Sequence, residues 1–355
     1  MDRVPIAFCD HLCGLLSING LQGAKELSGP YGQIAQCTFE HAVGYICSVK
    51  DGIEEDPVVS YEWNYPELEV PEAIEAVPKK FVRDVWIYLL DSEDERVSRK
   101  LVKRFPHATY HFVLGIQSIN EAWVDFACSL NRLQRVAITK KLDDDALRLF
   151  QRLITSRKLF ALMLHPKACE GAAMELPKSL FFQDQFEELR IQNPNGAPWR
   201  NTLVREVLEF WSENGDRLRG KHFVMDKNCE SGIEQLEEFL LRRTLATVCP
   251  TLLRVPAATL QIGRIFLVQR ALEVCSKEEC DLIDKEYRHN HTTFRIPSCV
   301  YKYEEGGETQ RRRLYFSFEC DKYREWQHLW RPASHNGHKD FTLMRNTSSL
   351  HILFA

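Results

Sequence analysis

Apolar residues recur along the middle of the chain with the spacing of short buried strands. Six segments carry the pattern apolar-x-x-apolar-x-apolar, exactly or nearly, and their last positions are 87, 112, 138, 164, 191 and 223. Successive positions are 25 to 32 residues apart, which leaves room for one helix and two turns in each interval. Such self-similarity at a nearly fixed period predicts a row of strand–helix units.

Helical patterns occupy the intervals between these strands, at residues 94–105, 120–130, 143–156, 202–215 and 232–243. In the third, Asp143 to Asp145 supply N-cap oxygens and negative charge at the positive end of the helix dipole. Its inward stripe is Leu147, Phe150, Leu153 and Ile154. Each unit can bury its apolar face only against its neighbours. We therefore predict an irregular leucine-rich-repeat-like βα solenoid over 81–250, its strands parallel on the concave side; an ordinary βα-rich domain without regular curvature is the alternative.

The first 45 residues read as a separate helical module. Pro5 suits the first turn of a helix, and the apolar residues that follow it recur at helical intervals: Phe8, Leu12, Leu15 and Leu16. Leu21, Ala24 and Leu27 continue in a second helical pattern, which Gly29-Pro30 ends. A unit of about 30 residues has too little interior to bury such stripes alone. An exposed apolar face predicts a partner; the alternative is a helical hairpin packed on the chain's own downstream domain.

The spacing of residues 4–35 resembles an F-box, the three-helix module that binds the Skp adaptor of cullin-RING ubiquitin ligases. The residues that carry the resemblance are Val4, Pro5, Phe8, Leu12, Leu16, Leu21, Leu27 and Tyr31. With the repeats that follow, the chain is similar to F-box/leucine-rich-repeat adaptors and to the lineage-expanded F-box-like families of nematodes. The resemblance implies a substrate-recognition adaptor of a Skp/cullin/F-box-type ligase, in which these residues contact the Skp-type adaptor.

Two further regions complete the predicted organisation. Residues 46–80 contain four prolines, many acidic residues and little periodicity, which indicates a connector. Residues 251–355 are predicted to hold a helix near 265–287 and a β-rich element from about 292. That element contains one hairpin around Gly306-Gly307 and a second around 346–348.

Composition narrows the class of protein. The 46 Lys and Arg against 50 Asp and Glu give a net charge of −4, and the basic clusters are scattered, so nucleic acid is not an expected partner. No segment approaches the roughly 18 apolar residues of a membrane span, and the start of the chain does not read as a signal peptide. We expect a cytoplasmic or nuclear protein with reduced cysteines.

Metal and catalytic sites are not predicted. Cys275 and Cys280 with His289 and His291 are residue types that zinc uses, but the cysteines lie in a helical pattern and the histidines are too close for a zinc finger. We interpret them as core and surface residues and expect no cofactor. No catalytic motif appears; His338 and Asp340, in a polar turn, are the first residues to test for an enzyme.

The strand side chains that point away from the helices are the predicted substrate contacts. In the third, fourth and fifth strands these include Arg135, Met163, Glu188 and Arg190. The set is mixed in charge and partly apolar, which suits a protein ligand. A protein-interaction scaffold that never meets a ligase remains the alternative function.

Overall fold

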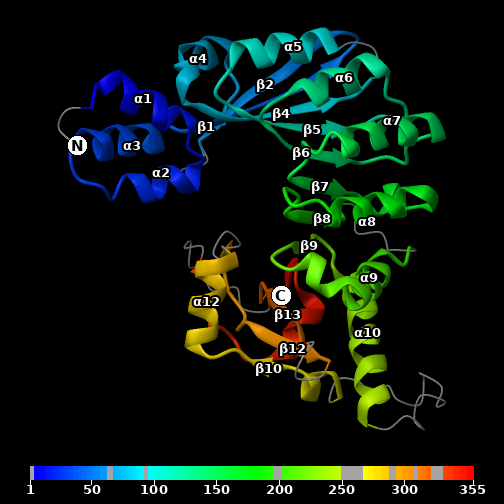
Figure 1. Cartoon of the computed structure of the whole chain (residues 1–355). Helices are drawn as coiled ribbons and strands as arrows, with labels where there is room; N and C mark the ends of the chain where they lie inside the picture. Colours follow the sequence, from blue (N-terminus) through cyan, green and yellow to red (C-terminus); the bar gives the residue numbers. More distant parts are fainter. Residues whose placement is uncertain are drawn as a thin grey trace. The chain divides into compact units, whose positions relative to one another are not determined.

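The computed structural model describes residues 4–61, 67–91, 95–194, 201–248, 267–287, 293–306, 311–320 and 331–355 (Figure 1). The protein is mixed α/β, as predicted. It divides into two compact units, residues 1–160 and 161–355, and this division differs from the boundaries at 45, 80 and 250 that the sequence suggested. Each unit has its own run of parallel strands.

Helices α1 (Ile6–Leu15), α2 (Ile18–Ala24) and α3 (Pro30–Glu40) begin unit 1. The Ser17 hydroxyl accepts a hydrogen bond from the Gly20 N–H at 3.2 Å and so caps α2. Pro30 starts α3, where its missing N–H leaves no helical bond unmade. The three helices share a buried cluster of Cys13, Leu21, Ala24, Ala35 and Phe39.

The sheet of unit 1 has the strand order β6-β5-β4-β1-β2-β3. Its members are β1 (Val43–Lys50), β2 (Ile53–Tyr61), β3 (Glu67–Leu68), β4 (Val82–Leu89), β5 (Thr109–Leu114) and β6 (Leu133–Ile138). Strands β1, β4, β5 and β6 are parallel, and β2 and β3 each run antiparallel to the strand before. The β4, β5 and β6 strands confirm the first three strand predictions.

The predicted connector 46–80 is mostly ordered secondary structure, because β1 and β2 form an antiparallel hairpin and α4 (Pro71–Ala76) follows. Alternate residues of β1 are buried. β2 has no such alternation, is mostly half-buried and carries three acidic residues, so its sequence did not indicate a strand. Pro57 is accommodated at a bulge: the register shifts between Ile46 and Ser48, and Asp56 has a φ of 48°. Trp63, Tyr65 and Pro66 lie outside the described residues.

Helices α5 (Glu95–Arg104), α6 (Glu121–Ser129) and α7 (Asp144–Thr155) lie along one face of these strands (Figure 1). Their positions confirm the helices predicted at 94–105, 120–130 and 143–156. The Asp143 carboxylate accepts from the Ala146 N–H at 2.7 Å, which is the predicted cap. Beneath the helices, Phe112 meets Trp123 and Phe126 edge-to-face at ring-centre distances of 5.5 and 6.2 Å.

The sheet of unit 2 begins with the parallel strands β7 (Ala161–Leu164), β8 (Glu188–Gln192) and β9 (His222–Asp226). Antiparallel strands then extend it in the order β15 (Ser349–Phe354), β13 (Arg312–Phe318), β12 (Tyr301–Glu305) and β10 (Glu273–Val274). Strands β11 (Thr293–Phe294) and β14 (Arg331–Pro332) form a small separate pair. The β12–β13 pairing confirms the hairpin predicted around Gly306-Gly307.

The second predicted C-terminal hairpin is wrong. Phe341–Asn346 forms the 3-10 helix η7, and β15 inserts between β9 and β13 in place of folding back on 341–346. Strand β15 has its residues from Leu350 to Phe354 all buried, so it needs strands on both edges, which a two-stranded hairpin does not provide. The short 3-10 helices η1 (Lys79–Phe81), η2 (Pro166–Ala168) and η3 (Gly171–Met174) complete the described elements of that type.

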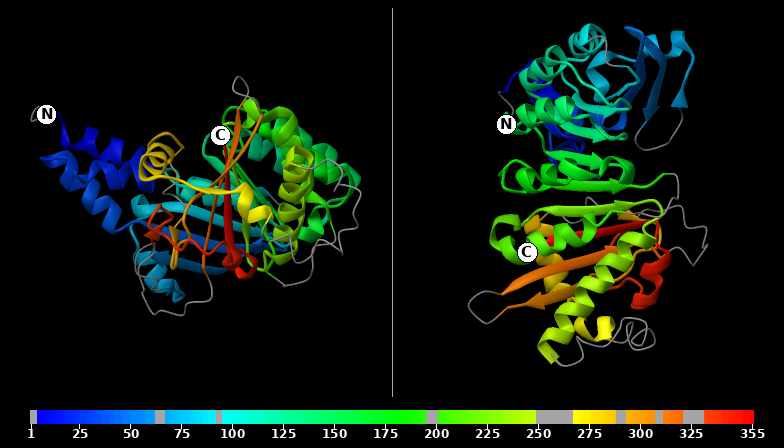
Figure 2. Two further views of the ribbon diagram at one scale, coloured as in Figure 1. Left: turned by 90° about the horizontal axis from the view of Figure 1, so that it is seen from below. Right: turned by 90° about the vertical axis from the view of Figure 1, so that its right-hand side faces the viewer.

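Helices α8 (Glu175–Phe181), α9 (Leu203–Leu218) and α10 (Glu230–Val248) cover one face of this sheet, whereas α12 (Lys277–Tyr287) lies on the other side of β12 and β13 (Figure 2). Trp211 of α9 packs against Phe354 and Phe239. The helices predicted at 202–215 and 232–243 are confirmed, and α8 was not predicted. The helix predicted near 265–287 is interrupted by β10.

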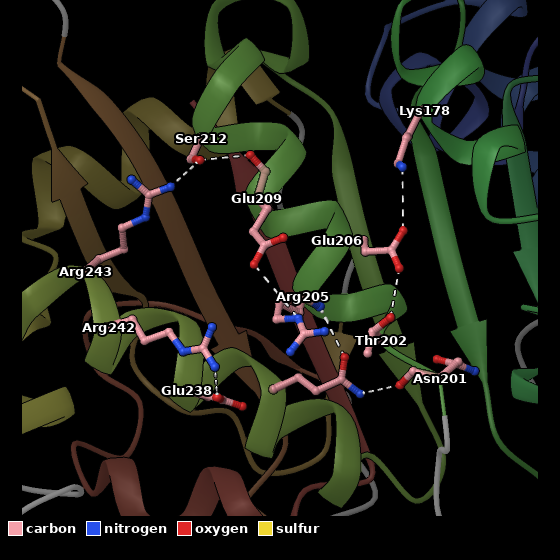
Figure 3. Close-up of polar contacts among 11 residues, drawn as sticks. Lys178, Asn201, Thr202, Arg205, Glu206, Glu209, Ser212, Glu238, Arg242 and Arg243 are labelled. Carbon is pink, nitrogen blue, oxygen red and sulfur yellow. Dashed lines mark hydrogen bonds and ion pairs between the residues drawn. The ribbon is translucent and has the colours of Figure 1, made fainter. Parts of the chain in front are cut away.

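Polar side chains on α8, α9 and α10 bind one another across the helix layer (Figure 3). Lys178 lies 3.5 Å from the Glu206 carboxylate, which also accepts from the Thr202 hydroxyl. The Gln235 amide bridges the Arg205 N–H and the Asn201 carbonyl. These groups satisfy one another, so we interpret this layer as structural.

Leu189 tests the predicted alternation of the strands. It is fully buried under the helix layer, and we expect Leu189→Ala to lower the free energy of unfolding by about 2–5 kcal/mol through lost burial and a cavity. Leu282→Ala on α12 is the matched control, because that leucine is 49% exposed. Equal midpoints of urea unfolding for the two variants would contradict the assignment.

Candidate functional site

An apolar stripe on α1 faces solvent. Phe8, Leu12 and Leu15 recur at i, i+4 and i+7 and so share one face of the helix; Phe8 is 52% exposed, Leu15 is 49% exposed and Leu12 is half-buried. The buried face of α1 is formed instead by Cys9 and Cys13. We call Phe8, Leu12 and Leu15 the α1 stripe.

The residues predicted to contact a Skp-type adaptor fall into three groups. Val4, Pro5, Phe8 and Leu27 are exposed. Leu12, Leu16 and Tyr31 are half-buried, and the last two pack on the cluster shared by the three helices. Leu21 is fully buried inside that cluster, so it is a core residue in this structure and not a surface contact.

Two arginines, Arg83 of β4 and Arg132 just before β6, hold the carboxyl end of α1. The buried Arg83 side chain donates to the Gly14 carbonyl at 2.9 Å and to the Leu16 carbonyl, and Arg132 donates to the Leu15 carbonyl at 3.5 Å. These carbonyls are among the last of the helix and lack helical partners, and the positive charge complements the helix dipole. Thus α1 packs on its own unit while the α1 stripe stays exposed.

We expect Arg83→Met to loosen α1 from the sheet. Losing two charge-assisted hydrogen bonds to carbonyls in a buried place should cost about 1–3 kcal/mol. Hydrogen–deuterium exchange should then rise in residues 6–40 more than in β5 and β6. Arg148→Met is the control, since Arg148 is an exposed residue of α7; the same exchange pattern in both variants would argue against this anchoring role.

A hollow of about 320 Å³ lies over β1 and β4, lined by Gly44, Ile46, Ser60, Asp84, Trp86 and His111. These side chains belong to the sheet face opposite the helices, because the alternate residues Val85, Ile87 and Phe112 form the core beneath α5 and α6. The pairings place Ser60, Gly44 and Asp84 in one row across the strands, and Ile46, Trp86 and His111 in the next. We call this site the Trp86 hollow.

Asp84, His111 and Trp86 are held in a fixed arrangement. His111 Nε2 lies 3.0 Å from Asp84 Oδ1, and the same oxygen accepts from the Thr109 hydroxyl. The His111 and Trp86 rings stack with centres 4.3 Å apart and planes 8° apart. Burial lowers the pKa of His111, and the hydrogen bond and charge of Asp84 oppose this shift only in part.

This arrangement suits the binding of a ligand better than acid–base catalysis. A neutral His111 donates its Nε2 proton to the Asp84 carboxylate, which therefore keeps its negative charge. The His111 side chain is 8% exposed, so it presents little surface to a reactant. Trp86 is half-buried and 23% of the Asp84 side chain is exposed, so the hollow presents an aromatic ring near a carboxylate, with the Arg135 Cζ 5.8 Å from the ring centre.

His111 should make stability depend on pH. Because its pKa is lowered in the folded protein, the unfolded chain takes up the proton first, so stability should fall as the pH drops below about 6.5, the ordinary histidine value. We expect His111→Gln to lose part of this dependence in urea titrations across that range, and His11→Gln, at an exposed histidine, to keep it. Identical pH dependence in wild type and His111→Gln would contradict the neutral form.

The residues predicted to bind a substrate are divided between the two units. Arg135 lies in unit 1, with Cζ 5.8 Å from the Trp86 ring centre. In unit 2, Arg190 binds Glu188 at 3.0 Å and also pairs with Asp226, so these charges satisfy one another. Met163 is only 8% exposed, which leaves it little contact surface.

Sequence reasoning missed the Trp86 hollow although a signal was present. Asp84, Trp86, Thr109 and His111 occupy the alternate positions of the first two predicted strands, and the prediction counted outward side chains only from the third strand on. An aromatic residue and a carboxylate at alternate positions of a strand indicate that this face of the sheet is not part of the hydrophobic core.

The remaining predicted groups lie elsewhere. Cys275 and Cys280 are buried in an apolar cluster with Ile283 and Phe294, in line with their interpretation as core residues, and His289 and His291 lie outside the described residues. Asp340 caps η7 by accepting from the Thr342 N–H, and the His338 carbonyl accepts from the Cys299 N–H. Among the described residues no group of three potential metal ligands comes together.

No protein-family model, curated protein or solved structure matches this chain. Within the part of the chain that the structure describes, no helix is long and apolar enough to cross a membrane.

Proposed function

We propose that the protein is a substrate-recognition adaptor of a Skp/cullin/F-box-type ubiquitin ligase, acting in the cytoplasm or nucleus. The observation that carries the proposal is the α1 stripe, which stays exposed on a helix whose other face is buried and whose end is anchored by Arg83. Exposed apolar side chains on a rigid helix are a typical surface for a protein partner.

The resemblance of residues 4–35 to an F-box gives that partner an identity. In this proposal the Skp-type adaptor contacts Val4, Pro5, Phe8, Leu12 and Leu27, which are exposed or half-buried. Leu16 and Tyr31 support the surface from the edge of the helical cluster. Leu21 contributes only to the fold of the helices.

We further propose that the strand–helix units of 81–250 act as an irregular leucine-rich-repeat-like solenoid that holds the substrate. Support comes from the parallel pairing of β4, β5 and β6 in unit 1 and of β7, β8 and β9 in unit 2. In unit 1 the helices leave the Trp86 hollow uncovered, which provides a place for a substrate side chain.

Phe8→Glu and Leu15→Glu should each reduce co-purification of the Skp-type adaptor and cullin at least tenfold, because a charge placed in a desolvated apolar contact costs several kcal/mol. Both side chains are about half exposed, so the variants should keep the wild-type thermal midpoint. Leu282→Glu on α12 is the matched control, with a leucine of the same exposure in unit 2.

Undiminished adaptor capture by both variants would overturn the ligase proposal. A protein that captures other partners but never a Skp-type adaptor would be an interaction scaffold. Retained capture by Leu282→Glu, together with loss in the two α1 variants, would place the contact on the α1 stripe.

A further inference from the structure

We infer that a cleft beside the α1 stripe receives an acidic side chain, aspartate or glutamate, of the protein partner that docks on the stripe. The inference rests on the proposed function, since it names the chemistry of the partner at that same surface. The cleft has a volume of about 270 Å³ and lies between one face of α1, Thr38 of α3, Lys80 and Phe81 at η1, and His107. We call it the Lys80 cleft.

The Lys80 cleft directly adjoins the α1 stripe. Ala7, His11 and Gly14 recur at i, i+4 and i+7 along α1, and all three line the cleft. Each residue of the stripe comes one position later in the sequence, so the two faces are about 100° apart around the helix. A partner that covers the stripe therefore has side chains within reach of the cleft.

Gly14 keeps the cleft open. A Cβ added at Gly14 would meet no atom within 4 Å, and Gly14 is not among the described glycines with positive φ. Neither packing nor backbone conformation therefore requires glycine at this position. Glycine weakens a helix relative to alanine, so α1 gives up some helical stability at the position where a side chain would occupy the cleft.

Positive charge predominates around the cleft. Lys80 Nζ lies 3.4 Å from Asp10 Oδ1, but both side chains are more than half exposed, so this ion pair is weak. An ammonium group has three N–H donors, and Lys80 can therefore bind a second carboxylate beside Asp10. Arg132 adds a second cation at the rim, because it donates to the carbonyls of His107 and Leu15, and no carboxylate of the described residues pairs with it. The charge of Asp10 disfavours a dianion such as phosphate more than a singly charged carboxylate.

The aromatic residues of the cleft add donors and fix one wall. His11 and His107 line the cleft from α1 and from the turn before β5, and an imidazole in either charge state has at least one N–H donor. The Phe81 ring stacks with His41 at a centre distance of 5.1 Å, and Lys80 Nζ lies 5.2 Å from the Phe81 ring centre. A carboxylate has two oxygens, so it can accept from the ammonium group and from an imidazole at once.

The first test uses the full chain and two capped amino acids, N-acetyl-glutamate methylamide and N-acetyl-glutamine methylamide. The two probes differ in charge and hardly in shape. Binding is followed through the ring C–H signals of His11 and His107 in NMR spectra, assigned by their absence in His11→Gln and His107→Gln. We expect the glutamate probe to shift both signals along one saturation curve, and the glutamine probe to bind at least fivefold more weakly at equal ionic strength. Equal affinities for the two probes would overturn the inference.

Two variants locate the site. Gly14→Leu should fill the cleft, and Lys80→Gln should remove the ammonium group; each should weaken binding of the glutamate probe at least fivefold. Gly23→Leu on α2 is the control for the first, since a Cβ at Gly23 also meets no atom within 4 Å. Lys79→Gln is the control for the second, because Lys79 is exposed in η1 and does not line the cleft. Wild-type affinity in a folded Gly14→Leu protein would also overturn the inference.

Capture of the Skp-type adaptor by the same variants separates this inference from the proposed function. We expect Gly14→Leu and Lys80→Gln each to reduce capture at least threefold, and the two control variants to retain it. Loss of capture in Phe8→Glu with full capture in both cleft variants would overturn the inference and leave the ligase proposal standing. A chain that selects the glutamate probe but never captures the adaptor would overturn the ligase proposal, and the cleft would then receive the acidic side chain of a scaffold's partner.

Discussion

The structure depends on the alternation of side chains along parallel strands that are covered by helices on one face. In unit 1, Val85, Ile87 and Phe112 point to the helices and are fully buried, and their neighbours Asp84, Trp86 and His111 point the other way. Neighbouring strands pair in a register that places core residues beside core residues and residues of the opposite face beside one another. Ile87 pairs with Phe112, and Trp86 pairs with His111. A slip by one residue would exchange the two faces and place the carboxylate of Asp84 in the core. The same constraint that builds the core therefore assembles the Trp86 hollow.

The attachment of the N-terminal helices follows from the start of the same strand. Arg83 is the second residue of β4 and is itself buried, so its guanidinium needs acceptors within the protein. The carbonyl oxygens at the end of α1 supply these acceptors. Carbonyls at a helix end lack helical partners, so they in turn need hydrogen-bond donors such as this guanidinium. This mutual requirement anchors the end of α1, and the cluster shared with α2 and α3 takes its buried face. Cys9 and Cys13 turn inward, and the bulkier Phe8 and Leu15 remain outside. A helix that buried its largest apolar residues would have no comparable surface for a partner.

Local periodicity was enough to predict most strands and helices, but not how strands pair. The last residues of the strands predicted to end at 87 and 112 pair with each other, and so do those at 164 and 191. Phe112, however, pairs with Val136 and not with residue 138, and Phe223 pairs with Leu189 and not with residue 191. Each of these two pairings is shifted by two residues from the predicted register, so each strand still presents the predicted face. The β1–β2 hairpin was missed because β2 is acidic and carries Pro57 at a bulge. The position of β15 could not be predicted, because its partner β9 lies more than 120 residues earlier in the chain. The α1 stripe was predicted as apolar residues, but which of them face outward depends on the packing of α1 against α2 and α3.

A binding site on strands loses less conformational freedom when a ligand binds than a site on a loop does. Asp84 and Trp86 emerge from a central strand that is paired on both sides, and each is held further, Asp84 by Thr109 and His111, Trp86 by stacking on His111. Their side chains therefore have little freedom left to lose when a ligand arrives. His111 is central to this arrangement because it touches both residues. Its neutral form, which burial favours, orients the carboxylate without neutralising it.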